Sequence, residues 1–169
     1  ETGIFVNFTN NSVVRNNNIM NVGLFSGSAN ESSVWFYGVK NISVYGNNIS
    51  NNDWGVIAES SSNISVYNNR FYNDSLIGIY MTQPTDQINI TDNYINLTQM
   101  GININNVGAF DLMAANIVRN NISNISIGIA LTTFRGNVSS NKVINASSES
   151  LTGTAGARVN DTRFENNLF

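Results

Sequence analysis

The sequence predicts an all-β fold built as a stack of about seven short coils, and three observations predict it. An Asn-x-apolar motif recurs every 21 to 30 residues; the six intervals from Ile19 to Phe169 span 150 residues, so the mean period is 25, within the range typical of solenoids. A Gly followed by aliphatic residues recurs between the copies. Ile and Val together number 33 against 7 Leu, and β-branched residues favour strands over helices.

Each copy of the motif carries an apolar residue three positions before its asparagine. In chain order the copies are Val14…Asn17-Asn18-Ile19, Val44…Asn47-Asn48-Ile49, Val66…Asn69-Arg70-Phe71, Ile90…Asn93-Tyr94-Ile95, Ile117…Asn120-Asn121-Ile122, Val138…Asn141-Lys142-Val143 and Phe164…Asn167-Leu168-Phe169.

Residues 42–49 illustrate the structure expected of one coil. Ile42 and Val44 alternate with polar or amphipathic neighbours, which predicts a short strand with these two side chains inward. Gly46-Asn47 predicts a bend, and Ile49 points inward from the next strand. At such a bend a carboxamide can both donate and accept, so equivalent asparagines can bond in a column along the axis. We expect this internal ladder to contain Asn17, Asn47, Asn69, Asn93, Asn120, Asn141 and Asn167.

The glycine signature follows each anchor residue within 4 to 10 positions. Its members are Gly23-Leu24, Gly55-Val56, Gly78-Ile79-Tyr80-Met81, Gly101-Ile102-Asn103-Ile104 and Gly128-Ile129-Ala130-Leu131, with Gly153-Thr154 as a weak member. Most distances from this glycine to the next anchor are 15 to 17 residues, but two are longer. The surplus predicts enlarged loops near 26–33 and 105–114, where binding tends to reside.

These Asn-x-Ile and Gly-Ile features resemble those of the right-handed parallel β-helix proteins with pectate-lyase-like repeats, over nearly all of Gly3 to Phe169. The resemblance implies a right-handed, single-stranded parallel β-helix. It leaves the activity open, because that family includes polysaccharide lyases, hydrolases and epimerases, phage tailspikes, adhesins, surface-layer proteins and copper-site maturation proteins. Leucine-rich repeats are the alternative, since Ile42-x-Val44-x-x-Asn47-x-Ile49 also fits their core; the scarcity of Leu and the Gly-Ile segments favour the β-helix.

Composition limits the partners and the chemistry. Charged residues make up 11% of the chain, and 33 asparagines provide much of its polar surface. The net charge of −3 gives no reason to expect nucleic acid as a partner, and no apolar run approaches the ~20 residues of a membrane span. The absence of Cys and His excludes disulfides, thiol chemistry and the commonest general base. We expect no cofactor and no metal.

The two ends of the sequence are in phase with the repeat. The chain stops at Leu168-Phe169, within a copy of the motif, and Gly3-Ile4-Phe5-Val6 begins the next phase. We therefore expect residues 1–169 to form a single β-helix domain that is either an excerpt of a longer β-helix or a subunit that stacks end to end on further copies.

Sequons are more frequent than chance predicts. Fourteen are present, whereas 33 Asn and 30 Ser plus Thr in 169 residues would give about 6 by chance (33 × 30/169). Two explanations are open. The alternation of outward and inward residues in a strand can by itself produce Asn-Ile-Ser; the functional explanation is glycosylation of an extracellular surface. The candidate acceptors are Asn7, Asn10, Asn30, Asn41, Asn48, Asn63, Asn73, Asn89, Asn96, Asn121, Asn124, Asn137, Asn145 and Asn160.

Catalytic residues are not evident. Enzymes of the resembled family use clustered carboxylates, often with Ca²⁺, whereas Asp53 and Asp74 lie in successive coils but out of register. A weak carbohydrate-binding candidate is aromatic: Tyr45 and Tyr67 share an outward position in neighbouring coils, with Trp54 on the following turn. The two tyrosines would equally stabilise the sheet as a stacked pair.

The sequence therefore favours a non-catalytic structural or adhesive β-helix module of a surface glycoprotein or fibre, located outside the cell or on its surface. Its expected partners are a second copy stacked end to end and glycans. The alternative is a polysaccharide-processing enzyme or a carbohydrate-binding β-helix, with catalytic residues on the two enlarged loops or outside residues 1–169. A periplasmic metal-centre accessory protein fits poorly, because His and Cys are absent and only 4 Met are present.

Overall fold

The structure, a computed structural model, describes residues 2–22, 32–84, 86–106, 113–132, 134–153, 159–165 and 167–169. Within these ranges the chain forms strands and no helix. The strands are β1 (Ile4–Asn7), β2 (Asn10–Arg15), β3 (Asn18–Met20), β4 (Ser32–Tyr37), β5 (Lys40–Tyr45), β6 (Asn48–Ser50), β7 (Trp54–Glu59), β8 (Ser62–Tyr67), β9 (Arg70–Tyr72), β10 (Ile77–Thr82), β11 (Ile88–Thr91), β12 (Tyr94–Asn96), β13 (Met100–Asn105), β14 (Met113–Val118), β15 (Asn121–Leu131), β16 (Phe134–Ser139), β17 (Lys142–Gly153) and β18 (Val159–Glu165).

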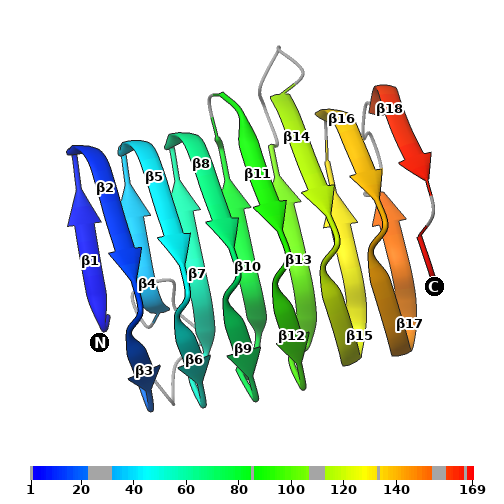
Figure 1. The fold of residues 1–169 in the computed structure, drawn as a ribbon, viewed down its shortest axis with the longest axis horizontal. Helices are drawn as coiled ribbons and strands as arrows, with labels where there is room; N and C mark the ends of the chain where they lie inside the picture. Colours follow the sequence, from blue (N-terminus) through cyan, green and yellow to red (C-terminus); the bar gives the residue numbers. More distant parts are fainter. Residues whose placement is uncertain are drawn as a thin grey trace.

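Every strand pairs in parallel with its equivalent in the neighbouring coil, so the predicted parallel solenoid is confirmed (Figure 1). One sheet has seven strands, in the order β18-β16-β14-β11-β8-β5-β2. The other has eleven and covers two faces: a long-strand face of β1, β4, β7, β10 and β13, and a short-strand face of β3, β6, β9 and β12. The two faces join at β15, which pairs with β12 near Asn121 and with β13 near Ile129.

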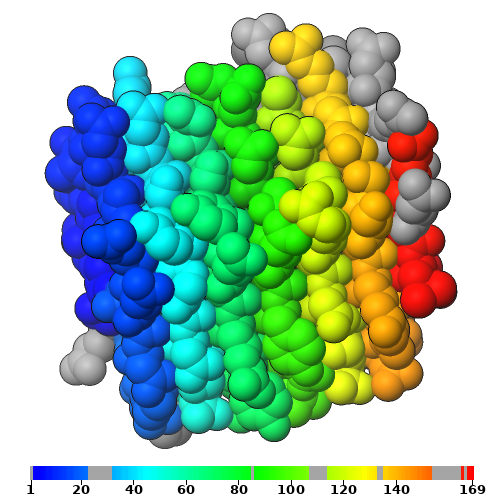
Figure 2. Space-filling view, in the orientation of Figure 1, coloured from blue at the N-terminus to red at the C-terminus, as the bar shows by residue number. Residues whose placement is uncertain are grey.

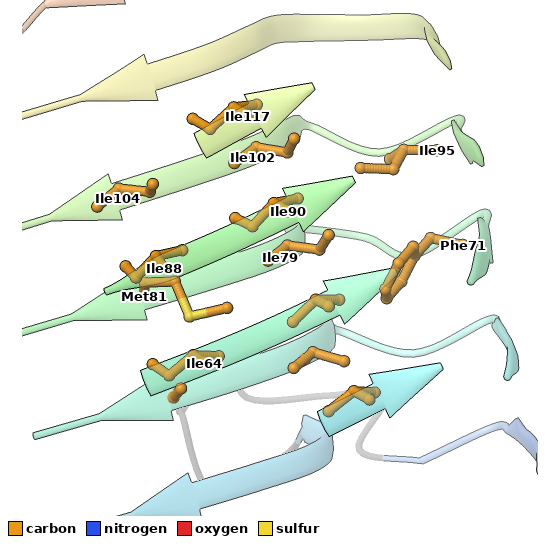
Figure 3. Packing of buried hydrophobic residues seen from close by; sticks show 14 of the residues in the cluster. Ile64, Phe71, Ile79, Met81, Ile88, Ile90, Ile95, Ile102, Ile104 and Ile117 are labelled. Carbon is orange, nitrogen blue, oxygen red and sulfur yellow. The ribbon is translucent and has the colours of Figure 1, made fainter. Parts of the chain in front are cut away.

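The hydrophobic core is a set of aliphatic columns along the axis. Ile42, Ile64 and Ile88 are in register across β5, β8 and β11 and are 0–1% exposed. Figure 3 shows the inward side chains of β10, β11 and the short strands meeting inside each coil. Burial of a side chain of this size stabilises the fold by about 1.5–3 kcal/mol, so the repeated Ile and Val positions are the main source of stability.

The recurring glycines mark a column where the backbones of successive coils approach closely. A Cβ on Gly101 would lie 2.6 Å from the carbonyl oxygen of Gly128, and a Cβ on Gly55 would lie 2.2 Å from that of Gly78. Real Cβ atoms do not approach a carbonyl this closely. The predicted Gly-aliphatic signature therefore reflects close packing along the axis, with the aliphatic residues filling the core after it.

The bends use left-handed backbone at fixed positions. The residue immediately before each ladder asparagine from Asn17 to Asn141 has a positive φ, for example Asn68 at 54° and Asp92 at 57°. Gly46 occupies the same position with φ 66°. The residue before the ladder asparagine therefore turns the bend, and the ladder residue itself provides hydrogen bonds.

Three details differ from the sequence expectations. In the described residues the number of complete coils is slightly below seven, because the last short-strand segment pairs through an isolated bridge between Lys142 and Leu168. Gly153 is not a member of the glycine column, since the carbonyl of Ser150 lies against Gly128 and Gly153 pairs with Leu131. Of the two loop segments, 32–33 belongs to β4, 105 to β13 and 113–114 to β14. Gly23-Leu24, residues 26–31 and 107–112 lie outside the described residues.

Figure 2 shows the coils as adjacent bands along the long axis, and the two chain termini lie at opposite ends of the stack in Figure 1.

No described helix is long and apolar enough to cross a membrane.

Candidate functional site

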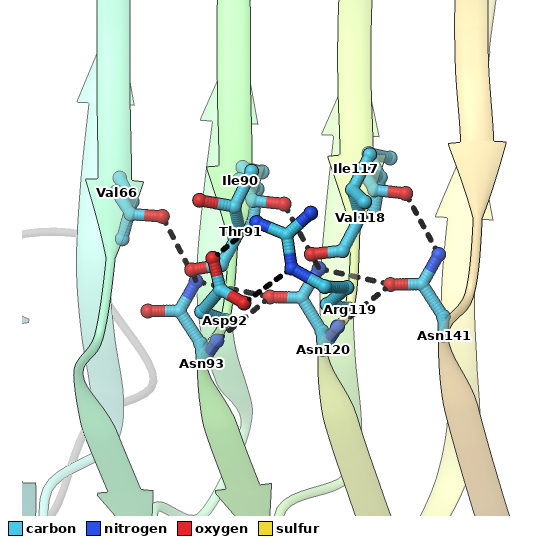
Figure 4. A network of polar contacts seen from close by, with 10 residues as sticks. All are labelled: Val66, Ile90, Thr91, Asp92, Asn93, Ile117, Val118, Arg119, Asn120 and Asn141. Carbon is cyan, nitrogen blue, oxygen red and sulfur yellow. Dashed lines mark hydrogen bonds and ion pairs between the residues drawn. The ribbon is translucent and has the colours of Figure 1, made fainter.

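The asparagine ladder runs along the bend between the seven-stranded sheet and the short-strand face. At each step the Oδ1 of one asparagine accepts two hydrogen bonds from the asparagine of the preceding coil, one from its backbone N–H and one from its Nδ2. Asn69 Oδ1 accepts from Asn47 N at 3.0 Å and from Asn47 Nδ2 at 2.9 Å. Figure 4 shows the same arrangement for Asn93, Asn120 and Asn141. The side-chain column joins Asn17, Asn47, Asn69, Asn93, Asn120, Asn141 and Asn167, as predicted.

The ladder also explains the three-residue spacing in the sequence motif. Asn69 Nδ2 donates to the carbonyl of Val44 at 2.9 Å, and Val44 is the apolar residue three positions before Asn47. The interior ladder asparagines are 1–3% exposed. A buried amide without partners would cost about 1–3 kcal/mol, so the satisfied column is an essential structural element and its amides are committed to one another.

A second buried column lies at the bend after the short strands and contains a carboxyl group. Asp74 Oδ1 accepts from Asn52 N at 3.1 Å and Asn52 Nδ2 at 3.0 Å, while Asn52 Oδ1 accepts from the backbone N–H of Val22 at 2.8 Å. Asp74 is 1% exposed, and its Oδ2 is buried with no hydrogen-bond partner among the described residues. Burial raises the pKa of Asp74 to about 7, with the hydrogen bonds from Asn52 opposing that shift.

Within the described ranges the acidic side chains do not gather at one place. Asp74 aligns with Asn52, so Asp53 is displaced by one position from it, as the sequence indicates. Among the described residues no three acidic, His or Cys side chains come close enough to hold a metal ion. Asp92 is held by Arg119 through two hydrogen bonds of 2.7 Å, and these bonds lower the pKa of Asp92.

The outer surface carries further amide columns. Asn41 Nδ2 donates to Asn11 Oδ1 at 2.9 Å, and Asn63 Nδ2 donates to Asn41 Oδ1 at 2.8 Å. Similar bonds join Asn18 to Asn48, Asn51 to Asn73, Asn89 to Asn116 and Asn124 to Asn145. Exposed hydrogen bonds of this kind add little stability individually, so their repetition chiefly gives the surface a regular array of amides.

The sequon asparagines are mostly on this outer surface. The exposed ones are Asn7, Asn10, Asn41, Asn48, Asn63, Asn73, Asn121, Asn124 and Asn145. Asn89 and Asn137 are half-buried, and Asn96 is an exception, 7% exposed with its Nδ2 donating to Ser123 Oγ at 2.8 Å. Asn30 and the side chain of Asn160 lie outside the described part of the structure.

The aromatic candidates lie on two different faces. Tyr45 and Tyr67 are in register on the seven-stranded sheet, and their rings stack with centroids 4.8 Å apart and planes 11° apart. Trp54 belongs to β7 on the long-strand face, where the centre of its ring lies 5.3 Å from that of the Tyr80 ring. Each tyrosine covers one face of the other, so the pair gains the stabilisation of ring stacking, and Trp54 does not extend it.

A shallow groove of about 560 Å³ lies beside the ladder bend and was not predicted from the sequence. It is lined by Gly46, Asn47, Asn48, Asn68, Asn69, Arg70, Asp92 and Tyr94. The Arg70 guanidinium lies 5.9 Å from the Tyr72 ring centre and 5.7 Å from that of Tyr94, within the range of cation–π attraction. Arg70 has no carboxylate partner among the described residues, whereas Asp92 is neutralised by Arg119.

In the sequence, Arg70 appears only as one residue of the Asn-x-apolar motif and is not predicted to bind a ligand. An alignment of the coils could have identified this group of residues, because Asn48, Arg70 and Tyr94 occupy the same position of successive coils. Lys142 shares this column but pairs with Asn121, so it lies away from the groove.

The comparisons with known proteins identify one family. A family model described as "Right handed beta helix region" matches residues 1–143. No curated protein and no solved structure matches the chain.

Proposed function

Because the chain belongs to the right-handed β-helix family, we propose that it is a non-catalytic structural module of an extracellular or cell-surface protein, presenting a repetitive glycosylated face. The observation that carries this proposal is the exposure of nine sequon asparagines on the outer surface of the described coils. N-linked glycans require surface acceptors and add a bulky, hydrated coat. Such a coat offsets a surface poor in charge, since charged residues are 11% of the chain.

The scaffold suits a spacer or display role. Each interior coil bonds to a coil on both sides through its sheets and through the buried asparagine column. Strands pack about 4.8 Å apart, so the module holds its surface groups at fixed intervals along the axis. Rigidity of this kind is the property that an extending or presenting module needs.

The first experiment is intact-mass spectrometry of the native-source protein with and without an N-glycosidase, combined with negative-stain imaging. We expect several glycans, removed as discrete mass decrements. A secreted protein with the unmodified sequence mass would contradict the glycosylated-face proposal. Variants that change only the third residue of a sequon, such as Ser43→Ala or Ser65→Ala, provide matched controls because the asparagine stays in place.

A second candidate function is carbohydrate binding at the Arg70 groove. The specific observation is a guanidinium within cation–π range of two tyrosine rings, without a carboxylate partner in the described part of the chain, in a groove that Asn48 and Asn68 also line. Aromatic rings can pack on sugar faces, the amides can bond hydroxyl groups, and the guanidinium favours an anionic sugar.

Calorimetry with acidic and neutral oligosaccharides tests this candidate. Arg70→Ala should abolish binding of the acidic ligand, and Lys142→Ala should leave it unchanged because Lys142 lies outside the groove lining. Equal binding by both variants would exclude the groove. Cleavage of an oligosaccharide in the same samples, lost in Asp53→Asn or Asp74→Asn, would instead support the enzymatic alternative.

A further inference from the structure

Among the sequon asparagines that the structure describes, two pairs are hydrogen-bonded neighbours along a surface column. Asn63 Nδ2 donates to Asn41 Oδ1 at 2.8 Å, and Asn145 Nδ2 donates to Asn124 Oδ1 at 3.0 Å. All four side chains are exposed. The members of each pair therefore offer the same acceptor atom in adjacent coils.

The side chains of the two members of a pair also project from the backbone in the same direction. Asn41 and Asn63 both adopt left-handed backbone, with φ values of 56° and 51°. Their strands, β5 and β8, pair in parallel without a shift between Lys40↔Ser62 and Tyr45↔Tyr67. Asn124 and Asn145 show the same match, with φ values of 54° and 56°. Groups attached to the two members would consequently project side by side.

We propose that branched N-glycans at the two members of such a pair exclude each other in the folded protein, so that a folded molecule carries a glycan on Asn41 or on Asn63, but not on both. The inference rests on the glycosylation proposed above. Neighbouring strands are about 4.8 Å apart, while a branched glycan core is several sugar rings wide. Two such cores leaving in the same direction would occupy the same space at their branch points.

A single glycan is compatible with the column. Transfer from a lipid-linked glycosyl phosphate forms a bond between Nδ2 and the anomeric carbon. The bond from that carbon to the phosphate oxygen breaks, the phosphate leaves with the electron pair, and Nδ2 loses one of its two protons. The remaining N–H can still donate to the neighbouring Oδ1, so occupancy of one site keeps the bond between the two asparagines.

Asn48 provides an internal control. It is exposed and donates to Asn18 Oδ1 at 2.9 Å, so its local bonding matches that of Asn41 and Asn63. Its column neighbours, however, are Asn18 and Arg70, and neither is a sequon acceptor. Glycans on Asn48 and Asn41 stand in different columns and do not compete.

Trypsin makes the test direct, because cleavage after Lys40 and Arg70 releases residues 41–70 as one peptide that contains all three acceptors. The full chain is secreted from a host that adds branched N-glycans, and the folded fraction is isolated by gel filtration. Before trypsin is added, enzymatic release of the glycans from the denatured intact chain in H₂¹⁸O converts each occupied Asn to ¹⁸O-labelled Asp, which tandem mass spectrometry locates in the peptide.

We expect peptides labelled at 41 and 48, and at 48 and 63, with doubly labelled 41 and 63 confined to unfolded, retained protein. Ser43→Ala should raise occupancy of Asn63, and Ser65→Ala should raise that of Asn41. Secreted peptide labelled at both 41 and 63, as often as the product of the single occupancies, would overturn the exclusion and leave the proposed glycosylated face intact. Failure of Asn63 to gain occupancy in Ser43→Ala would also contradict it. A secreted chain unlabelled at every sequon would contradict the proposed function itself.

Discussion

Asp74 accepts two hydrogen bonds from Asn52 through a single carboxylate oxygen, in the arrangement that each ladder asparagine uses toward its neighbour. The other oxygen is buried and has no hydrogen-bond partner in the part of the chain that the structure describes. A carboxyl group thus occupies a place where the fold elsewhere uses an amide, and the site should titrate.

Stability should fall as pH rises from about 4 to about 7. The folded-state pKa of Asp74 is raised from 3.8 to about 7 by burial, so the folded chain retains a proton that the unfolded chain loses above pH 3.8. The contribution is fully present below the unfolded-state pKa and is lost at about 1.4 kcal/mol per pH unit through this window. Asp74→Asn should remove this slope and be more stable than the parent at pH 8. Urea unfolding at pH 4, 6 and 8 measures the free energy of unfolding, with the exposed Asp86→Asn as control. If the stability of Asp74→Asn falls with pH as steeply as that of the parent, Asp74 is not the group responsible.

Truncation of an interior ladder residue should be severe. Asn69→Ala removes the side-chain acceptor of the Asn47 backbone N–H and the side-chain donor to Val44 O, and a buried group left unpaired costs about 1–3 kcal/mol. It also removes one acceptor of Asn47 Nδ2, which keeps Val14 O and Tyr45 O. We expect a loss of at least about 3 kcal/mol. Asn48→Ala, which removes one exposed bond, should cost within about 0.5 kcal/mol. Similar costs for the two variants in chemical denaturation would contradict the ladder's structural role.

Substitutions along the glycine column should follow the closeness of the next coil. A Cβ added at Gly78, Gly101 or Gly55 would lie 3.0, 2.6 or 2.2 Å, respectively, from the facing carbonyl oxygen. Alanine at Gly78 should therefore destabilise least and alanine at Gly55 most, with overpacking costs of about 1–3 kcal/mol or more. Thermal unfolding of the three variants gives the order, and equal melting temperatures would show that the backbone relaxes freely.

The tyrosine pair should contribute a measurable coupling energy. Tyr45 and Tyr67 stack at 4.8 Å, and aromatic pairs contribute about 0.5–1.5 kcal/mol beyond burial. A double-mutant cycle with Tyr45→Ala and Tyr67→Ala should return a value in this range. The same cycle with Tyr45→Ala and Tyr94→Ala should be additive, because Tyr94 is on the short-strand face; additivity in both cycles would leave the stack without energetic significance.

Much of the fold could be predicted because each coil repeats the same alternation of inward and outward residues and the same bend. The inward alternation at Ile42 and Val44 and the bend asparagine Asn47 each carry a pattern in sequence, and the structure confirms all three. The weak glycine, Gly153, was wrongly assigned because distance along the chain cannot show a bulge; the register between β15 and β17 shifts between Ile125 and Ile127. Ser150 takes the column position instead.

The candidate surface was less predictable. The sequence located the sequons but could not show that Asn96 is buried against Ser123, or that Asn41 and Asn63 touch. Trp54 is near Tyr45 in sequence, yet the intervening bends carry it to another face. The Arg70 groove arises from three coils, and no single coil contains its signal.

The sequence by itself determined the parallel solenoid, its ladder asparagines and its core columns, because period, alternation and hydrogen-bonding capacity are properties of one coil repeated. Only the tertiary structure decided which surface side chains become neighbours, which left-handed residue turns each bend, and that Asp74 is buried beside Asn52. These depend on the register between coils, where a shift of one residue exchanges inward and outward positions.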